Sequence, residues 1–180
     1  MGKENTTDRR PHSIHEGPMN KPRILLLGVG NILYTDEGLG VHAVRLLQEG
    51  WTFSDNVELM DGGTLGKLLM APIMDCDELI VLDAVLGGEK PGSVYRLEDE
   101  GLRKSLGFRD SQHQVDLVDT LISCEMAGHR PHAVVMGIEP EDWKTMGMEV
   151  GPTVKAVMPR YLELVLKELA TAGGTAKAKP

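Results

Sequence analysis

The sequence is poor in cysteine and in long apolar runs, and each shortage excludes a class of protein. Its two cysteines, Cys76 and Cys124, lie far apart and in no C-x-x-C arrangement, so neither a disulfide framework nor a thiolate zinc site is predicted. We expect two buried free thiols. No run of about 18 apolar residues occurs, so a membrane-spanning helix is not expected.

Positive charge is also scarce. The net charge is -8, which argues against binding to nucleic acid or to an anionic membrane, because both need a basic patch. Residues 1–21 are polar, lack the apolar segment of a secretory signal, and are expected to form a disordered leader. We therefore expect a cytoplasmic protein, monomeric, with no nucleic-acid or membrane partner.

Short apolar runs alternate with segments of helical period over residues 22–170. With 180 residues, 41% of them hydrophobic, the chain has the size and composition of one domain. The alternation predicts an α/β fold, a single domain with a twisted, mostly parallel five-stranded sheet and helices on both faces. Residues 171–180 are expected to be a flexible tail.

The expected elements follow from local patterns. The predicted strands are 23–29, 56–61, 78–83, 93–97 and 132–138, of which the shorter and more polar 93–97 should be an edge strand. The predicted helices are 36–50, a short one capped by Thr64 and stopped by Pro72, 114–127, and 153–170. Pro159 should kink the last helix or start a new segment.

Acidic residues follow the predicted strands where those strands end. Asp36 and Glu37 come after the first strand and its glycine turn, Asp61 ends the second, and Asp83 ends the third. Ligands of open α/β sheets bind outside the carboxyl ends of parallel strands, so these carboxylates should converge if the strands are neighbours. Carboxylates gathered in this way repel one another unless a cation or protons lie among them. With an imidazole from His113, they would suit a first-row divalent metal ion.

Structural explanations compete with the metal site. Acids at a helix N-terminus, such as Asp36 and Glu37, are favoured by capping and by the helix dipole. Asp61 could start a turn at the two glycines that follow it, and His113 could be a solvated loop residue. Asp83, at the end of an apolar strand, is the hardest to explain by structure alone, and the coincidence of all four positions favours the metal.

A nucleotide-binding α/β domain is the main competing fold-level interpretation, because Gly28 and Gly30 imitate half of a dinucleotide fingerprint. The third glycine of that pattern would fall at Leu33, and the acids at the helix N-terminus oppose a phosphate. A nucleophilic hydrolase is disfavoured as well, since there is no G-x-S-x-G elbow.

Separate segments of the chain together resemble the maturation endopeptidases of nickel-iron hydrogenases, from about residue 23 to residue 169. The matching segments are Gly28-Val29-Gly30-Asn31, Asp36-Glu37-Gly38-Leu39-Gly40-Val41, Asp61-Gly62-Gly63-Thr64, Asp83-Ala84, Pro91-Gly92, His113-Gln114, Gly137-Ile138-Glu139-Pro140 and 154–159. Any one of these segments alone would be a weak signal, whereas their number and order make the resemblance strong.

The resemblance implies a protease that removes the C-terminal extension of a hydrogenase large-subunit precursor after nickel insertion. The family's metal-contacting residues carry over onto Glu37, Asp83 and His113, and the nickel would be supplied by the precursor. Asp36 or Asp61 is the candidate general base of what we expect to be an aspartic-type endopeptidase.

Three alternatives to this protease stay open. The same acidic crevice could serve a nickel carrier that cuts nothing, a protease for another enzyme's precursor, or a degenerate binding module. Three further histidines, His42, His129 and His132, are expected to be surface or core residues, with His42 the one placed to reach the metal region.

Overall fold

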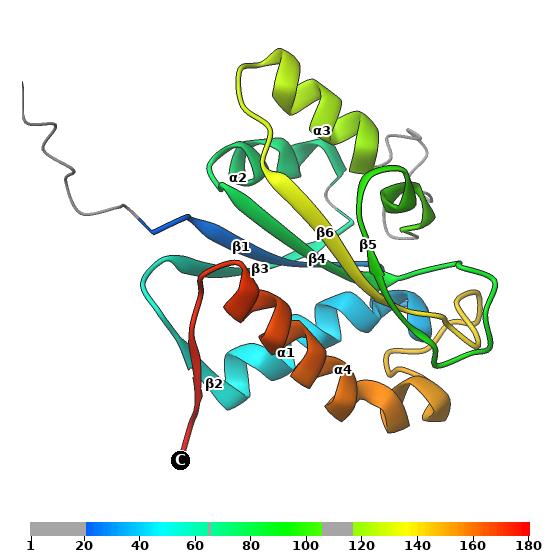
Figure 1. Cartoon of the computed structure of the whole chain (residues 1–180). Coiled ribbons are helices and arrows are strands. Elements are labelled where there is room, and N and C mark those ends of the chain that lie inside the picture. The colour runs from blue at the N-terminus through cyan, green and yellow to red at the C-terminus, as the bar shows by residue number, and fades with distance from the viewer. Residues whose placement is uncertain (1–20, 65, 106–116) are drawn as a thin grey trace, which may run out of the picture.

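The computed structural model describes residues 21–64, 66–105 and 117–180, and a five-stranded sheet forms its centre (Figure 1). The strand order is β3-β1-β4-β6-β5. The bounds are β1 Ile24–Val29, β3 Val57–Gly63, β4 Glu78–Ala84, β5 Val94–Leu97 and β6 His132–Ile138. All neighbours are parallel except β5, which runs antiparallel to β6 at the edge. The α/β class, the mostly parallel sheet and the edge position of residues 93–97 are confirmed.

Helices cover both faces of the sheet, as predicted. In Figure 1, α1 (Leu39–Gly50) and α4 (Pro152–Thr171) lie on one face, and α2 (Met70–Met74) and α3 (Leu117–Met126) lie on the other. Successive side chains of a strand point to opposite faces, so Leu26 packs in the first core cluster and Leu27 in the second. Every residue of β1 is buried, which explains its uninterrupted apolar run. No helix in the described ranges combines the length and apolarity needed to cross a membrane.

One of the two helix-interior prolines behaves differently from the prediction. After the 3₁₀ helix η2 (Gly66–Leu69), Pro72 lies inside α2 instead of stopping a helix, so that expectation was wrong. Pro72 is the third residue of α2, where backbone N–H groups have no intrahelical acceptor, so its missing donor costs little. Pro159 lies within a single continuous α4 and starts no new segment. Residues 114–116 of the expected 114–127 helix lie outside the described residues.

Two short strands form a second sheet that the sequence pattern did not predict. β2 (Trp51–Phe53) pairs antiparallel with β7 (Ala176–Ala178), and Lys179 N–H donates to the Gly50 carbonyl at 2.8 Å. The stretch expected as a flexible tail therefore contains a paired strand. Its side chains are exposed, so backbone hydrogen bonds rather than apolar burial hold it. The predicted leader lies almost entirely outside the described residues.

Glycines let α1 approach the sheet closely. A Cβ on Gly40 would lie 1.9 Å from the Leu82 carbonyl oxygen and 2.5 Å from that of Val29. A Cβ on Gly28 would lie 2.4 Å from the Gly40 carbonyl oxygen. The first turn of α1 thus touches the backbones of β1 and β4 directly, next to the strand ends that carry the acids.

Gly40→Ala should therefore destabilise the protein by about 3 kcal/mol or more, because the clash is with strand backbone that cannot rotate away. Gly50→Ala is the matched control on the same helix, since no atom lies within 4 Å of the position that its new methyl group would take. The control should stay within about 1 kcal/mol of the parent. Urea unfolding measures both, and equal stabilities would contradict the close approach.

Candidate functional site

Buried acids gather at the carboxyl edge of the central sheet. β3, β1 and β4 are parallel neighbours, so their carboxyl ends lie side by side. The 3₁₀ helix η1 (Asp36–Gly38) follows β1, and its first two residues are 0% and 5% exposed. Asp83, near the end of β4, is 0% exposed. Acids this deeply buried need compensating partners or a cation.

The predicted metal site combines four acids with the imidazole of His113. Among the described residues, no group of three or more His, Cys, Asp or Glu side chains could hold a metal ion. The four predicted acids therefore share one edge without forming a complete ligand set by themselves. His113, the predicted imidazole, lies outside the described residues.

Asp36 holds a distant segment of the chain. Its Oδ2 accepts the backbone N–H groups of Glu141 and Asp142 at 2.9 and 3.0 Å, and its Oδ1 accepts that of Gly151 at 2.7 Å. Its own N–H donates to the Asp142 carbonyl at 3.0 Å, and the Thr35 hydroxyl donates to the same carbonyl. This geometry favours a positioning role for Asp36, which ties residues 141–151 to the end of β1.

Asp83 is held by its own neighbour and by a residue that the sequence analysis did not identify. Oδ1 accepts the Ala84 N–H at 2.7 Å, and Oδ2 accepts the hydroxyl of Ser105, which is 1% exposed. A carboxylate offers about four lone-pair positions, and these two bonds fix its orientation at the strand end. Ser105 follows the 3₁₀ helix η3 (Asp99–Lys104), and no sequence signal marks it as a partner of Asp83.

Asp61 lies at the same edge but is more exposed and ion-paired. Its Oδ2 accepts two bonds from the Arg45 guanidinium, at 2.8 and 3.1 Å, and its Oδ1 accepts the Gly63 N–H at 3.1 Å. Its side chain is 36% exposed. The Gly63 bond is the turn-starting contact that the competing structural explanation anticipated.

Glu139 is a fourth buried acid at this edge, and the sequence analysis gave it no role. It directly follows β6 and is 7% exposed. Its Oε2 accepts the N–H groups of Gly87 and Gly88, at 2.8 and 3.0 Å, and the Tyr95 hydroxyl. Glu139 thereby fixes the loop between β4 and β5. The signal that singled out Asp83, an acid after an apolar strand, applies to Glu139 as well and could have found it.

The glycine turn after β1 does not form a phosphate cradle. Gly30 has a φ of +126°, and a Cβ there would lie 1.9 Å from the Glu37 carbonyl oxygen. The missing side chain of Gly30 therefore lets the backbone of η1 approach, whereas the second glycine of a dinucleotide fingerprint lets a pyrophosphate approach. The turn brings η1 against the strand end and so positions Glu37.

The remaining histidines make contacts in different parts of the fold. His132 bonds Glu78 at 2.7 Å at the amino end of its strand, and His129 contacts the Cys76 carbonyl at 2.7 Å. His42, on α1, is half-buried; burial lowers its pKa, and its Nε2 has no hydrogen-bond partner among the described residues. Only His42 is close in sequence to the acids.

Both cysteines are free and buried, as predicted. Burial raises the pKa of Cys76 to about 12 and also raises that of Cys124. A thiol with a raised pKa is a poor nucleophile near neutral pH, since the thiolate is the reactive form. These environments disfavour a nucleophilic hydrolase that would use either cysteine.

Several known proteins similar to this chain are connected with hydrogenases. The family model described as "Hydrogenase maturation protease" matches residues 41–168. The chain is 38% identical to the hydrogenase expression/formation protein HupD of Thiocapsa roseopersicina, over 88% of this chain and 72% of the relative. It is 37% identical to the hydrogenase 2 maturation protease of Escherichia coli, over 84% of this chain and 93% of the relative.

A solved structure supports the same connection. The hydrogenase maturating endopeptidase HybD from Escherichia coli superposes with a TM-score of 0.78 at 36% sequence identity, covering 87% of this chain and 98% of that structure. Both the fold and the sequence therefore agree over nearly all of the central domain.

Proposed function

Because the chain belongs to the hydrogenase maturation protease family and is a peptidase, we propose that it removes the C-terminal extension of a hydrogenase large-subunit precursor after nickel has been inserted. The observation that carries the proposal is the pair of buried carboxylates beyond two neighbouring parallel strands, Glu37 in η1 after β1 and Asp83 near the end of β4. Buried acids at a ligand-binding edge are what recognition of a cation requires.

Glu37, Asp83 and His113 recognise the nickel of the precursor. Carboxylate oxygens and an imidazole are a donor set that suits a first-row divalent ion. The hydrogen bond from Ser105 fixes the orientation of the Asp83 carboxylate. Carboxylates that contact metals are commonly oriented by hydrogen bonds of this kind. Nickel is part of the substrate here, so the three side chains act as a sensor that docks a loaded precursor and holds its scissile bond nearby.

Hydrolysis then adds water across the scissile peptide bond, with hydroxide joining the carbonyl carbon and a proton joining the departing amine. The nickel of the substrate can polarise the carbonyl or lower the pKa of the attacking water. Both acids predicted as bases already accept three hydrogen bonds. Asp61 is the better candidate because its side chain is 36% exposed, whereas Asp36 is fully buried and holds residues 141–151.

The direct test is to incubate the purified protein with nickel-loaded and nickel-free precursor and to measure intact masses. We expect only the loaded precursor to lose a C-terminal peptide. Cleavage of both forms would contradict nickel recognition. Transfer of nickel without loss of mass would instead identify a nickel carrier, and no change in either would contradict the assignment of this substrate.

A further inference from the structure

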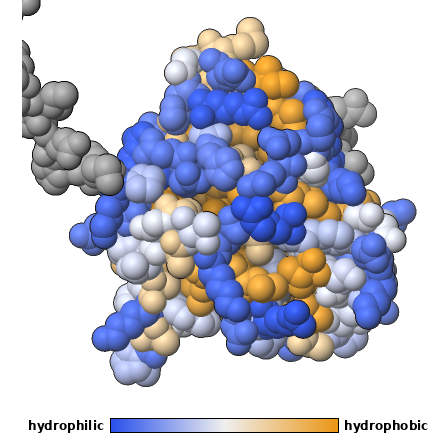
Figure 2. Space-filling model, viewed as in Figure 1, coloured by the Kyte–Doolittle hydropathy of each residue, from blue (hydrophilic) through white to orange (hydrophobic). Residues whose placement is uncertain are grey.

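A groove separates the edge strand β5 from helix α4. Its volume is about 750 Å³. Apolar side chains, among them Met136, Val157 and Leu164, contribute to its lining, and Figure 2 shows hydrophobic side chains gathered between β5 and α4 with hydrophilic ones around them. The groove is not part of the acidic edge described above, and the proposed chemistry does not use it.

The lining of this groove is cationic in an acidic protein. Four positively charged side chains line it, Lys90, Arg96, Arg160 and Lys167, and Glu168 is its one carboxylate. The whole chain, by contrast, has 19 Lys and Arg residues against 27 Asp and Glu residues. A local excess of cations beside an apolar floor favours an anionic ligand with an apolar body.

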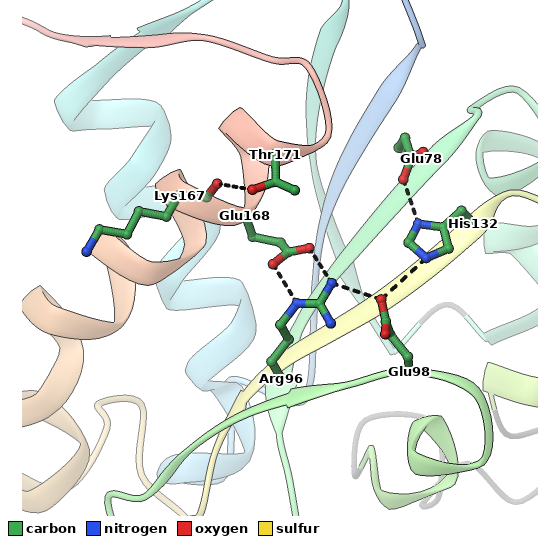
Figure 3. Close-up of polar contacts among 7 residues, drawn as sticks. All are labelled: Glu78, Arg96, Glu98, His132, Lys167, Glu168 and Thr171. Atoms are coloured by element: carbon green, nitrogen blue, oxygen red, sulfur yellow. Dashed lines mark hydrogen bonds and ion pairs between the residues drawn. The ribbon is translucent and has the colours of Figure 1, made fainter.

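The Arg96 side chain forms ion pairs within the protein and leaves the edge of β5 accessible. Its guanidinium bonds Glu168 of α4 at 2.7 and 2.9 Å and Glu98 at 2.8 Å, while Glu98 also lies 3.4 Å from His132 (Figure 3). Charged side chains on edge strands usually discourage pairing with another chain. Here the charge is folded back onto α4, where it joins β5 to the helix.

The backbone of β5 offers a template for an added strand. Within the described part of the chain, β5 pairs with β6 alone, so its other side is an open edge. Such an edge presents a row of N–H and C=O groups that an extended peptide can bind, with pockets beside it that select side chains. The groove provides such a pocket along the same strand.

One row of paired residues runs from the acidic edge to the strand that lines the groove. Asp83 pairs with Gly137 of β6, and Gly137 pairs with Tyr95 of β5, so the three residues lie in one row across the sheet. Two strand spacings separate Asp83 from Tyr95, which is about 10 Å. An extended chain covers this span with roughly three residues. The Asp83 side chain faces the other side of the sheet, because its neighbours Leu82 and Ala84 pack in the same core cluster as α4. A peptide leaving the proposed cleavage position would therefore pass over the carboxyl ends of the strands to reach the groove.

We propose that this groove binds the C-terminal extension of the precursor as an added strand along β5. The carboxylates of the extension, including its C-terminal carboxylate, lie against Lys90, Arg160 and Lys167. The inference rests on the proposed function, which supplies an extended segment that always ends in a free carboxylate. It assigns the binding energy for the extension to a surface separate from the nickel-recognising acids.

The first test uses peptides alone, so that it does not depend on cleavage. A short fluorescein-labelled peptide of alternating Glu and Val should bind in a fluorescence anisotropy titration, and an alternating Lys and Val peptide should not. The Lys90→Glu/Arg160→Glu variant should weaken binding by about tenfold or more. Lys21→Glu/Lys177→Glu changes the net charge equally at exposed sites outside the groove and should bind as the parent does. Equal binding by the two variants would overturn the proposal.

A second test with the same peptides asks whether the bound peptide pairs with β5 as an added strand. N-methylation of alternate residues removes the N–H groups from one edge of an extended peptide only. Of the two peptides methylated at odd or at even positions, one should lose binding and the other should keep it, because only one edge faces β5. Equal affinities of the two methylated peptides would rule out an added strand.

Cleavage kinetics with the nickel-loaded precursor test the groove and the protease activity separately. If the extension binds in the groove, Lys90→Glu/Arg160→Glu should raise KM about tenfold with little change in kcat, since the nickel-recognising acids are untouched. Normal KM in that variant would overturn the groove assignment and leave the protease intact. Peptide binding without any precursor cleavage by the parent protein would support the groove and contradict the proposed substrate.

Discussion

Glu37→Gln is expected to abolish processing of the nickel-loaded precursor while the fold is retained. Glutamine has nearly the same shape, so the closely packed turn between β1 and α1 should survive. The substitution removes the negative charge that the proposal assigns to nickel recognition, and loss of a metal contact of this kind costs several kcal/mol. Abolished processing here means a rate lower by on the order of a thousandfold or more, equivalent to ~4 kcal/mol.

Intact-mass assays of cleavage, together with near-UV circular dichroism for the fold, measure this effect. Glu58→Gln is the matched control, because it makes the same chemical change on an exposed residue of β3. The control should process the precursor at the parent rate. Normal processing by the Glu37 variant would exclude the sensor role, and loss of the circular dichroism signal would show that Glu37 instead supports the fold.

Asp36→Ala should have the largest effect on stability among the acids. It removes the acceptor of three backbone N–H groups that belong to residues 141, 142 and 151. Hydrogen bonds to a charged group contribute roughly 1.5–3 kcal/mol each and are not additive, so a total loss of about 3 kcal/mol is expected. That is a large part of the roughly 5–15 kcal/mol of stability that is typical of a domain. Urea unfolding gives the change directly.

Amide hydrogen exchange distinguishes a local from a global loss of stability in the Asp36→Ala variant. Exchange at residues 141, 142 and 151 should accelerate more than exchange in the central strands, because the carboxylate holds that segment in particular. Asp61→Asn is the control, since it removes a partly exposed ion pair with Arg45 and should cost less than about 1 kcal/mol. Equal costs for the two substitutions would contradict the holding role of Asp36.

The strands were predictable because their signal is local. The apolar run at residues 23–29 becomes β1, buried on both faces, and the shorter and more polar 93–97 becomes the edge strand β5. The pairing of β2 with β7 was not predictable, since backbone bonds join segments more than 120 residues apart and the side chains of β7 are exposed. An exposed strand such as β7 leaves no apolar periodicity to detect.

The place of the acids was likewise predictable, while their individual roles were not. The rule that ligands bind at the carboxyl ends of parallel strands located Glu37 and Asp83 at one buried edge. It could not distinguish Asp36 from Glu37, because the partners of Asp36 lie 105 to 115 residues further along the chain. The assignment of the general base stays a prediction.

Local pattern alone therefore determined the fold class, the five strands of the central sheet and the group of acids at their ends, because burial on a sheet imposes a period on neighbouring residues. Only tertiary packing decided what each acid does. Asp36 binds the 141–151 segment, Asp61 pairs with Arg45, and Ser105 orients Asp83. A carboxylate's function depends on the donors that surround it, and the fold brings those donors from positions that have no fixed spacing along the chain.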